Sequence, residues 1–548
     1  MKISWRTFFP LLAALLIPFT LPAQVTPDRL VHASDEPQNW LTYSGGYASQ
    51  RYTLLKQVDP SNVKNLELKW VFQVQSLQKF ETTPLVVDGI MYITQSPNDV
   101  VAVDAKTGRA FWLYHYAPSP AARPCCGIVN RGLAILGDSL FMATVDAHLV
   151  AIDAKDGHPR WNVKLAEAAA GYAATMAPLV VKDKVIVGVA GGEYGIRGFI
   201  AAFDTQTGKQ DWKFDTVPDP DQPGHDSWKG TDWEHGGAAV WVTGSYDPEL
   251  NMTYWGTGNP GPDWNAEQRP GDNLYSDSVL ALDADTGKMK WYFQFTPHDA
   301  YDYDSVQVPV LANANWNGSP RKLMLWGNRN GFFYVLDRGT GKFLNGKPFV
   351  KVTWASGLDA NGRPLATPQP PGTPTFPGIQ GGTNWYSPSY SPSTGLFYLS
   401  TWEDYSTIFK GVPTDYKNGA RFTGGANTSP IPGADNPAGA RNGPINTYTE
   451  AMARGGVVAI DPATGDKKWK FELHDVNTSG ILTTATDLLF VGGREGYFQA
   501  LDARTGTLLW KQNLGGEIIA GPISFQVDGK QYITIASGNS LFAYSLRE

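Results

Sequence analysis

The stretch Val101-Ala102-Val103-Asp104-Ala105-Lys106-Thr107-Gly108-Arg109-Ala110-Phe111-Trp112 contains the pattern that decides the fold. Small apolar residues lead into Asp104, Gly108 follows four positions later, and Trp112 stands eight positions after the Asp. Apolar residues of this kind predict a β-strand, and Asp with Gly predicts a tight turn in which the Gly adopts a positive φ. The stretch therefore predicts a β-hairpin whose second strand carries a Trp that docks against the neighbouring unit.

The same pattern, Asp-x-x-Thr-Gly or a close variant followed by Trp, recurs along most of the chain. The complete copies are Asp104–Trp112, Asp153–Trp161, Asp204–Trp212, Asp283–Trp291, Asp461–Trp469 and Asp502–Trp510. Asp337 begins a further copy, in which Asn345 occupies the Trp position. Successive Asp residues are 49, 51, 79, 54, 124 and 41 positions apart. Repeats of roughly 40–50 residues with four strands each are typical of a β-propeller.

The longest gap, between Asp337 and Asp461, has room for a further blade. We interpret Ser391–Tyr398 as the degenerate hairpin of that blade, which brings the number of units to eight. Trp70 then predicts a docking Trp on an N-terminal strand that closes the ring. The predicted fold class is all-β, an eight-bladed β-propeller with tryptophan-docking motifs, formed by residues 24–548.

Two stretches do not fit blade geometry. Residues 354–382 are rich in Pro and Gly, and residues 410–449 are rich in Gly, Asn and Pro. We interpret both as long surface insertions. The sequence leaves open whether they cover one mouth of the ring or are plain loops.

The N-terminus has the features of an export signal. Lys2 and Arg6 precede the apolar run Phe8–Leu21, and Leu-Pro-Ala ends at Ala23. This arrangement predicts a signal peptide over residues 1–23 and export to the periplasm. A transmembrane anchor is less favoured, because the run is short and is interrupted by proline. We expect no stable membrane insertion, since no other segment is apolar enough to cross a bilayer.

Composition excludes one class of partner. The formal net charge of the 548-residue chain is −7, and its Lys and Arg residues form no basic stripe. A nucleic-acid partner is therefore not expected.

The only two cysteines, Cys125 and Cys126, are adjacent. In an oxidising compartment such a pair is expected to form a disulfide, which would stabilise the fold little because it closes almost no loop. The alternative, two inert small residues, stays open at this point. The Cys-x-x-Cys-His pattern of covalent haem attachment is absent from the sequence, so electrons released by a redox reaction would need a separate carrier.

Oxygen-bearing side chains form the second group of interest. Asp302 and Asp304 are two apart, so in an extended chain both carboxylates point to the same side. Glu193 and Asn259 follow apolar strands and sit among glycines. Hard cations such as Ca2+ bind several oxygens of this kind. Taken singly, each residue is equally well explained by a solvated loop or by turn chemistry.

Several motifs in a fixed order resemble a known family, the methanol/ethanol dehydrogenases that use pyrroloquinoline quinone (PQQ). The resemblance extends across essentially the whole mature chain. It is carried by Phe80-Glu81-Thr82-Thr83-Pro84, Cys125-Cys126 with Asn130-Arg131-Gly132, Thr175-Met176-Ala177-Pro178, Gly192-Glu193, Gly258-Asn259-Pro260, the Asp302 segment and Asn328-Arg329-Asn330-Gly331.

The resemblance implies a role for each motif residue. Cys125 and Cys126 would form a disulfide ring against one face of the PQQ, with Trp241 against the other face. The remaining cofactor contacts would come from Glu81, Arg131, Thr175, Gly191, Gly192, Arg329 and Asn384. The metal ligands would be Glu193, Asn259, Asp302 and Asp304, and Asp302 would also be the catalytic base.

The function implied is oxidation of a primary alcohol to an aldehyde by hydride transfer to PQQ, with a metal as Lewis acid and a c-type cytochrome as electron acceptor. An acidic residue at the position of Asp304 resembles the lanthanide-dependent branch of the family, so a lanthanide is favoured over Ca2+. The resemblance also implies that a homodimer is one of the open oligomeric states. Two other readings are a propeller scaffold for outer-membrane protein assembly and a PQQ-dependent sugar dehydrogenase.

Overall fold

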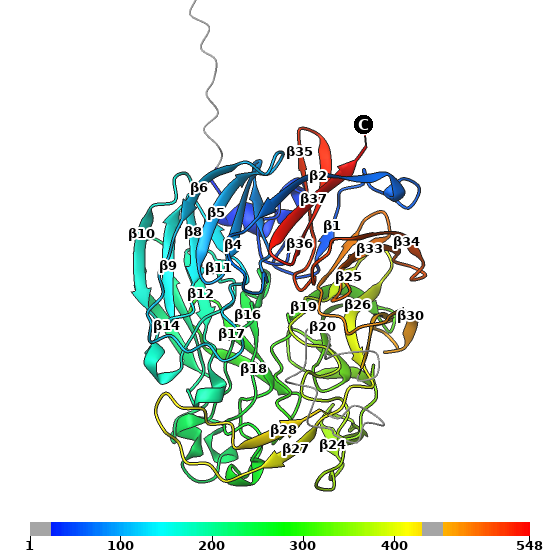
Figure 1. Cartoon of the computed structure of the whole chain (residues 1–548). Coiled ribbons are helices and arrows are strands. Elements are labelled where there is room, and N and C mark those ends of the chain that lie inside the picture. Colours follow the sequence, from blue (N-terminus) through cyan, green and yellow to red (C-terminus); the bar gives the residue numbers. More distant parts are fainter. Residues whose placement is uncertain (1–23, 430–452, 548) are drawn as a thin grey trace, which may run out of the picture.

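The computed structural model describes residues 24–429 and 453–547, which form a ring of four-stranded antiparallel sheets (Figure 1). The expected signal peptide, residues 1–23, and the part of the second insertion from 430 to 449 lie outside the described residues. Eight blades are present in the described ranges, so the prediction of an all-β, eight-bladed β-propeller is confirmed.

Each blade is a simple meander, and the first strands of neighbouring blades contact one another around the central axis. Seven blades are continuous in sequence apart from insertions. They are β3 (Leu85–Val87), β4 (Ile90–Gln95), β5 (Asp99–Asp104), β6 (Ala110–Tyr114); β7 (Ala134–Leu136), β8 (Ser139–Ala143), β9 (His148–Asp153), β10 (Pro159–Lys164); β11 (Leu179–Val181), β12 (Lys184–Gly188), β13 (Phe199–Asp204), β14 (Gln210–Asp215); β15 (Ser245–Asp247), β16 (Met252–Gly256), β17 (Ser278–Asp283), β18 (Met289–Gln294); β19 (Val310–Trp316), β20 (Ser319–Gly327), β21 (Phe332–Asp337), β22 (Phe343–Pro348); β25 (Ser389–Ser391), β26 (Leu396–Glu403), β29 (Arg454–Ile460), β30 (Lys467–Leu473); and β31 (Ile481–Thr484), β32 (Leu488–Val491), β33 (Tyr497–Asp502), β34 (Leu508–Asn513).

The eighth blade joins the two ends of the chain. It contains β35 (Ile523–Val527), β36 (Lys530–Ser537) and β37 (Ser540–Leu546), with the N-terminal β2 (Leu66–Gln73) as its outer strand. β2 pairs antiparallel with β37, and Figure 1 shows the blue strand beside the red one. The expectation that the strand of Trp70 closes the ring is therefore confirmed.

The repeated hairpins dock as the pattern predicts. Gly108 has a φ of 73° and donates its N–H to Asp104 O at 2.8 Å, so Asp and Gly form the turn between β5 and β6. The Trp112 ring at the end of this pattern packs on the turn of the next blade: a Cβ added to Gly157 would lie 2.6 Å from the ring. The turn glycine thus has two reasons to be glycine, its positive φ and the flat ring against it.

The assignment of Ser391–Tyr398 to a blade of its own is wrong. This hairpin joins β25 to β26, the first two strands of the blade whose last two strands carry Asp461 and Trp469. Ser391-Pro392-Ser393-Thr394-Gly395 differs from Asp-x-x-Thr-Gly only at its first defined residue, and Gly395 donates its N–H to Ser391 O at 2.8 Å, the same contact that closes the Asp-Gly turns. The eighth blade is the closing one, which carries no copy of the Asp-x-x-Thr-Gly turn.

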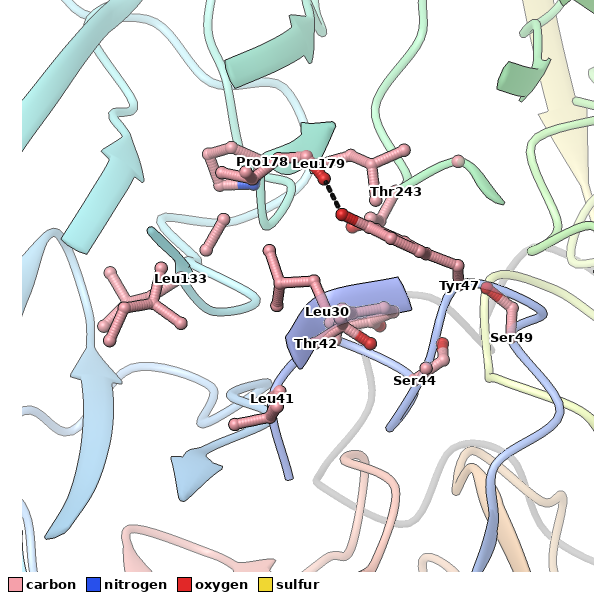
Figure 2. Close-up of a pocket in the computed structure, with 16 residues that line it drawn as sticks. Leu30, Leu41, Thr42, Ser44, Tyr47, Ser49, Leu133, Pro178, Leu179 and Thr243 are labelled. Atoms are coloured by element: carbon pink, nitrogen blue, oxygen red, sulfur yellow. Dashed lines mark hydrogen bonds between the residues drawn. The ribbon is translucent and has the colours of Figure 1, made fainter. Parts of the chain in front are cut away.

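One end of the central channel is closed by the N-terminal segment, residues 25–53. Its backbone bonds to inner strands around the ring: Tyr47 O accepts from Tyr246 N, Gln50 O from Tyr390 N and Arg51 O from Thr483 N. Short β1 (Tyr52–Thr53) adds to β31 in parallel. Figure 2 shows Tyr47, whose hydroxyl donates to Val180 O at 2.8 Å, among residues of this segment and residues at the starts of three neighbouring blades.

Insertions add two small hairpins, β23 (Ala355–Leu358) with β24 (Pro364–Ala366), and β27 (Ile408–Gly411) with β28 (Gly425–Thr428). The helices are short. They are α1 (Pro27–Val31) and the 3-10 turns η1 (Ala33–Asp35), η2 (Val63–Asn65), η3 (Ala168–Ala170), η4 (Gly192–Tyr194), η5 (His225–Ser227), η6 (Asp232–His235) and η7 (Ala266–Gln268). Within residues 24–429 and 453–547, no helix reaches the length and apolarity needed to cross a bilayer.

Candidate active site

A single cavity of about 320 Å3 lies at the end of the channel opposite the N-terminal segment. Every residue assigned a site role in the sequence lines it. These residues are Glu81, Cys125, Cys126, Arg131, Thr175, Gly191, Gly192, Glu193, Trp241, Asn259, Asp302, Asp304, Arg329 and Asn384.

Strand order explains why residues so far apart in sequence meet. Inner strands run away from the cavity, so the loop that precedes each of them opens into it; Glu81 precedes β3 and Arg131 precedes β7. The second strand of each blade runs back antiparallel, so the loop that follows it also opens there; Asn259 follows β16 and Arg329 follows β20. The propeller thus delivers two loops per blade to one place.

Cys125 and Cys126 are joined by a disulfide that lines this cavity. The Glu193 carboxylate lies against it, with Oε1 2.9 Å from Cys125 Sγ and 3.3 Å from Cys126 Sγ. Sulfur in a disulfide is not a thiolate, so this pair is not a metal ligand. The disulfide therefore supplies a wall of the cavity next to a carboxylate.

Arg329 organises the acidic side of the cavity. Its Nη1 donates to Asp304 Oδ2 at 2.5 Å and its Nη2 to Asp302 Oδ2 at 3.3 Å, while Nε donates to Ile379 O at 3.0 Å. Asp304 Oδ1 in turn accepts the backbone N–H of Asn259 at 2.9 Å. Asp302, Asp304 and Asn259 are thereby fixed beside one guanidinium.

Burial changes the protonation equilibria of this cluster. It raises the pKa of Asp302 well above the ordinary value; Arg329 opposes this, and the neighbouring Asp304 and Asp263 add to it. Burial also raises the pKa of Glu193, with Asp304 acting in the same direction. Burial disfavours the charge of Arg329, yet Asp302 and Asp304 raise its pKa. Negative charge is thus concentrated beyond what Arg329 neutralises, which is the condition that favours a bound cation.

A second guanidinium, Arg131, organises the opposite side. Its Nη2 lies 2.8 Å from Glu81 Oε2 and its Nη1 donates to Thr175 Oγ1 at 2.8 Å. The guanidinium carbon is 5.1 Å from the ring centre of Trp241 and 4.4 Å from that of Trp385. Cations with planar aromatic neighbours suit an anionic, flat ligand.

The remaining predicted residues shape the cavity wall. Gly191 has a φ of 118°, and a Cβ there would lie 2.1 Å from Gly171 O, so only glycine fits. A Cβ on Gly192 would lie 3.8 Å from Asn259 Oδ1, at the edge of the metal-ligand group. Asn384 donates its side-chain N–H to Gln380 O at 3.0 Å.

Sequence reasoning missed several lining residues. Asp263 is 1% exposed, and burial raises its pKa well above the ordinary value. Trp264 and Trp385 add aromatic wall. Arg421 belongs to the β27–β28 insertion and donates to Cys125 O at 3.2 Å. The only sequence signal for Asp263 was its position four residues after Asn259. No sequence signal marked Arg421, because it stands in a Gly- and Asn-rich stretch without a periodic pattern.

The described part of the second insertion packs beside the cavity. Phe422 N–H donates to Glu193 O at 2.7 Å, and the Tyr416 ring stacks on His235 at 3.4 Å between centroids. These contacts hold the 411–429 segment against the loop that carries Glu193.

The donor set fits PQQ and a hard metal ion. Several buried atoms have no hydrogen-bond partner among the described residues, including Arg131 Nε, Asp263 Oδ1 and Asn427 Oδ1, and all three residues line the cavity. Buried polar groups are normally satisfied, so a ligand is expected to complete them. The carboxylates are oxygen donors for a hard cation, and the cavity volume is in the range of small-molecule sites.

Comparison with known proteins identifies relatives over nearly the whole chain. Quinoprotein alcohol dehydrogenase PedH of Pseudomonas putida is 38% identical over 563 residues, covering 96% of this chain and 90% of the relative. The lanthanide-dependent methanol dehydrogenase of Methylacidiphilum fumariolicum is 37% identical, covering 96% and 89%. The solved structure of a europium-containing methanol dehydrogenase superposes with a TM-score of 0.87 at 34% identity, covering 95% of this chain and 100% of that one.

The family described as "Glucose/ethanol/alcohol dehydrogenase, beta-propeller domain" matches residues 40–352 and 352–533. These ranges include every residue that lines the cavity and seven of the eight blades in full; they end within β36 of the closing blade, before β37. The chain belongs to this PQQ-dependent dehydrogenase family of β-propellers.

Proposed function

We propose that the protein is a PQQ-dependent alcohol dehydrogenase that oxidises a primary alcohol to an aldehyde at this cavity. The observation that carries the proposal is the meeting of Glu193, Asn259, Asp302 and Asp304 in one cavity with the Cys125–Cys126 disulfide. A binding scaffold has no use for buried acids and a vicinal disulfide at one end of its channel. Membership of a dehydrogenase family also favours the enzyme over the scaffold.

The residues divide between two ligands. Arg131, Thr175, Glu81 and Asn384 would hold the polar edge of PQQ, with the Cys125–Cys126 disulfide and Trp241 as walls for its flat faces. Glu193, Asn259, Asp302 and Asp304 would hold the metal ion. When bound, PQQ supplies a two-electron acceptor and the metal a Lewis acid.

Asp302 is the group placed to take the proton of the alcohol hydroxyl. Its carboxylate lines the cavity, and the raised pKa that burial gives it makes it a stronger proton acceptor than an exposed aspartate. Arg329 fixes one Asp302 oxygen through Nη2 and so orients the other. Arg329 also offers a fixed positive charge where negative charge develops. The apolar and aromatic walls exclude water from the acceptor.

We propose a lanthanide as the metal, with Ca2+ as the alternative. Asp304 adds a carboxylate to the donor set, and a trivalent ion requires more negative ligand charge than a divalent one. The names of two similar proteins, a lanthanide-dependent and a europium-containing methanol dehydrogenase, support this choice.

We also propose export to the periplasm and a c-type cytochrome as electron acceptor. The signal-like residues 1–23 and the disulfide support the compartment. The absence of a Cys-x-x-Cys-His motif from the sequence supports a separate carrier. A homodimer is proposed from family resemblance alone.

A PQQ-dependent sugar dehydrogenase is the second candidate, since the family description includes glucose. Alcohols are favoured because the relatives named above are alcohol dehydrogenases. Dye reduction with ethanol and with glucose under identical conditions decides between them. Faster turnover of glucose would replace the alcohol proposal.

The deciding experiment is steady-state dye reduction by PQQ-loaded protein over a series of alcohols, with La3+ or Ca2+ as the only added metal. We expect turnover with primary alcohols and a higher rate with La3+. The Asp304→Ala variant should lose La3+-supported turnover. Equal or higher activity with Ca2+, or undiminished La3+ activity in the variant, would contradict the lanthanide assignment, whereas no alcohol turnover with either metal would contradict the enzyme itself.

A further inference from the structure

Asp263 is a buried acid beside the proposed metal ligands, and the family-derived ligand set does not include it. The residue is 1% exposed and lines the cavity, and its Oδ1 has no hydrogen-bond partner among the described residues. An unpartnered carboxylate oxygen in a low-dielectric site is costly to the folded state. A buried oxygen without a partner indicates a ligand that the protein chain alone does not supply.

The surroundings of Asp263 point to a cation. Its side chain interacts with that of Asn259 and lies within electrostatic reach of Glu193 and Asp304. Buried Arg269 does not neutralise the carboxylate by contact. Its Nε and Nη2 donate instead to the backbone oxygens of Pro262 and Asp263, each at 3.0 Å. The loop is thereby fixed at the cavity by backbone contacts, and the Asp263 carboxylate is not paired with Arg269.

Charge balance gives Asp263 a function. As metal ligands Glu193, Asp263, Asp302 and Asp304 would be ionised and would carry four negative charges, of which Arg329, the buried cation bonded to Asp302 and Asp304, leaves three uncompensated. Arg131 is paired with Glu81 and is not counted here. Arg421 acts on Glu193, but it is exposed and donates to Cys125 O, so solvent screens its charge more than that of buried Arg329. Three negative charges match a trivalent ion. Without Asp263 two would remain, which match a divalent ion.

We propose that Asp263 is a fourth carboxylate of the metal site and makes the site select a trivalent over a divalent cation. The inference rests on the proposed function, because it concerns the same metal. It adds a residue and a selectivity that the ligand set from the resemblance does not contain.

The test is equilibrium dialysis of PQQ-loaded protein against buffered La3+ and against buffered Ca2+, with bound metal measured by mass spectrometry. In Asp263→Asn, which removes one negative charge at nearly constant volume, we expect the ratio of La3+ to Ca2+ affinity to fall about tenfold or more, since charge loss weakens a trivalent ion more. Asp263→Glu keeps the charge and should keep the ratio within about threefold of wild type.

Asp156→Asn is the matched control, because it makes the same charge change at an exposed side chain far from the cavity. It should leave the ratio unchanged. A wild-type ratio in a folded Asp263→Asn, together with a lowered ratio in Asp304→Asn, would overturn the role of Asp263 and leave the proposed function intact. Absence of metal binding in wild type itself would overturn both. Near-ultraviolet circular dichroism establishes that each variant is folded.

Discussion

The two ends of the propeller channel are each built around a buried arginine, and the arginines have opposite surroundings. At the end closed by the N-terminal segment, Arg51 donates to Tyr43 O at 3.0 Å and to Pro522 O at 2.7 Å. At the other end, Arg329 donates to the carboxylates of Asp302 and Asp304. The first arginine is held by backbone oxygens through Nη1 and Nη2, and the second by carboxylates that can take part in the reaction.

Their electrostatics differ accordingly. Burial lowers the pKa of Arg51, and no carboxylate contacts it to compensate. The carboxylates around Arg329 raise its pKa in spite of burial. One end therefore uses backbone oxygens to tie blades together, and the other concentrates charge that a bound ion must balance. The comparison indicates that the closed end of the channel contributes mainly to stability, whereas the cavity end contributes to function.

The largest effect on turnover should come from replacing Asp302, the proposed proton acceptor in the cavity. Asp302→Asn keeps the shape but cannot take the alcohol proton, so turnover should fall by about 10²–10⁴-fold, the usual share of a general base. Dye reduction with a primary alcohol measures it. Metal and PQQ contents of the same preparation separate proton transfer from metal loss. Turnover above a tenth of wild type at full cofactor content would contradict the role.

The matching substitution at the closed end should act on stability alone. Arg51→Met removes two charged hydrogen bonds and leaves buried carbonyls unpartnered, which should cost roughly 2–4 kcal/mol of unfolding free energy. Denaturant unfolding measures it. Turnover per folded molecule should stay unchanged, because Arg51 does not line the cavity. A loss of turnover without a loss of stability would break the separation of the two ends.

The closure of one channel end by the N-terminal segment could not be predicted from the sequence, whereas most residues of the cavity at the other end could. Residues such as Glu81 and Arg329 stand in recognisable motifs, so their meeting could be predicted through resemblance. The N-terminal segment bonds through backbone atoms, which carry no residue signature; Tyr47 O and Gln50 O would bond equally well from other side chains. Asp263 was missed because a single acid in a Gly- and Pro-rich loop has no periodic pattern.

Blade number could be predicted because the Asp-Gly turn and its docking Trp are a local pattern with a local cause. Closure of the ring by the strand of Trp70 could also be predicted, from its docking Trp. What could not be predicted is that this closing blade is itself the eighth, because β2 pairs with β37 from the opposite end of the chain, which no local pattern records. The Ser391–Gly395 turn resembles the pattern because it has Thr and Gly at the same positions, with Ser in place of Asp. The repeated turn motif thus predicted the number of blades, but only the structure of the closed ring shows which strands belong to each blade.

A smaller effect is expected from the disulfide. Replacing Cys125 and Cys126 together by Ala removes a cross-link between adjacent residues, so unfolding free energy should change by less than about 1 kcal/mol. PQQ affinity, measured by equilibrium binding, should fall about tenfold because one flat wall of the cavity is lost. A strongly destabilised variant with unchanged PQQ affinity would assign the disulfide to the structural role instead.

The smallest effect concerns the tether of the β23–β24 insertion at the site end. Arg363 donates to Asp272 through Nη1 and Nη2, each at 2.8 Å, and the hydrogen bond from Arg363 lowers the pKa of this half-exposed Asp272. An exposed pair of this kind contributes about 0.2–1 kcal/mol. Arg363→Gln should therefore raise hydrogen exchange of β23 and β24 at pH 7 by at most about fivefold.

The pH dependence follows from the lowered pKa of Asp272. The stabilisation is present above the pKa of the unfolded state and disappears as pH falls through the lower folded value, so the difference between wild type and Arg363→Gln should vanish in acid. Lys182→Gln, which removes the exposed pair with Asp285, is the matched control and should leave β23 and β24 unchanged. A difference that persists in acid would mean that Arg363 holds the insertion by packing rather than by charge.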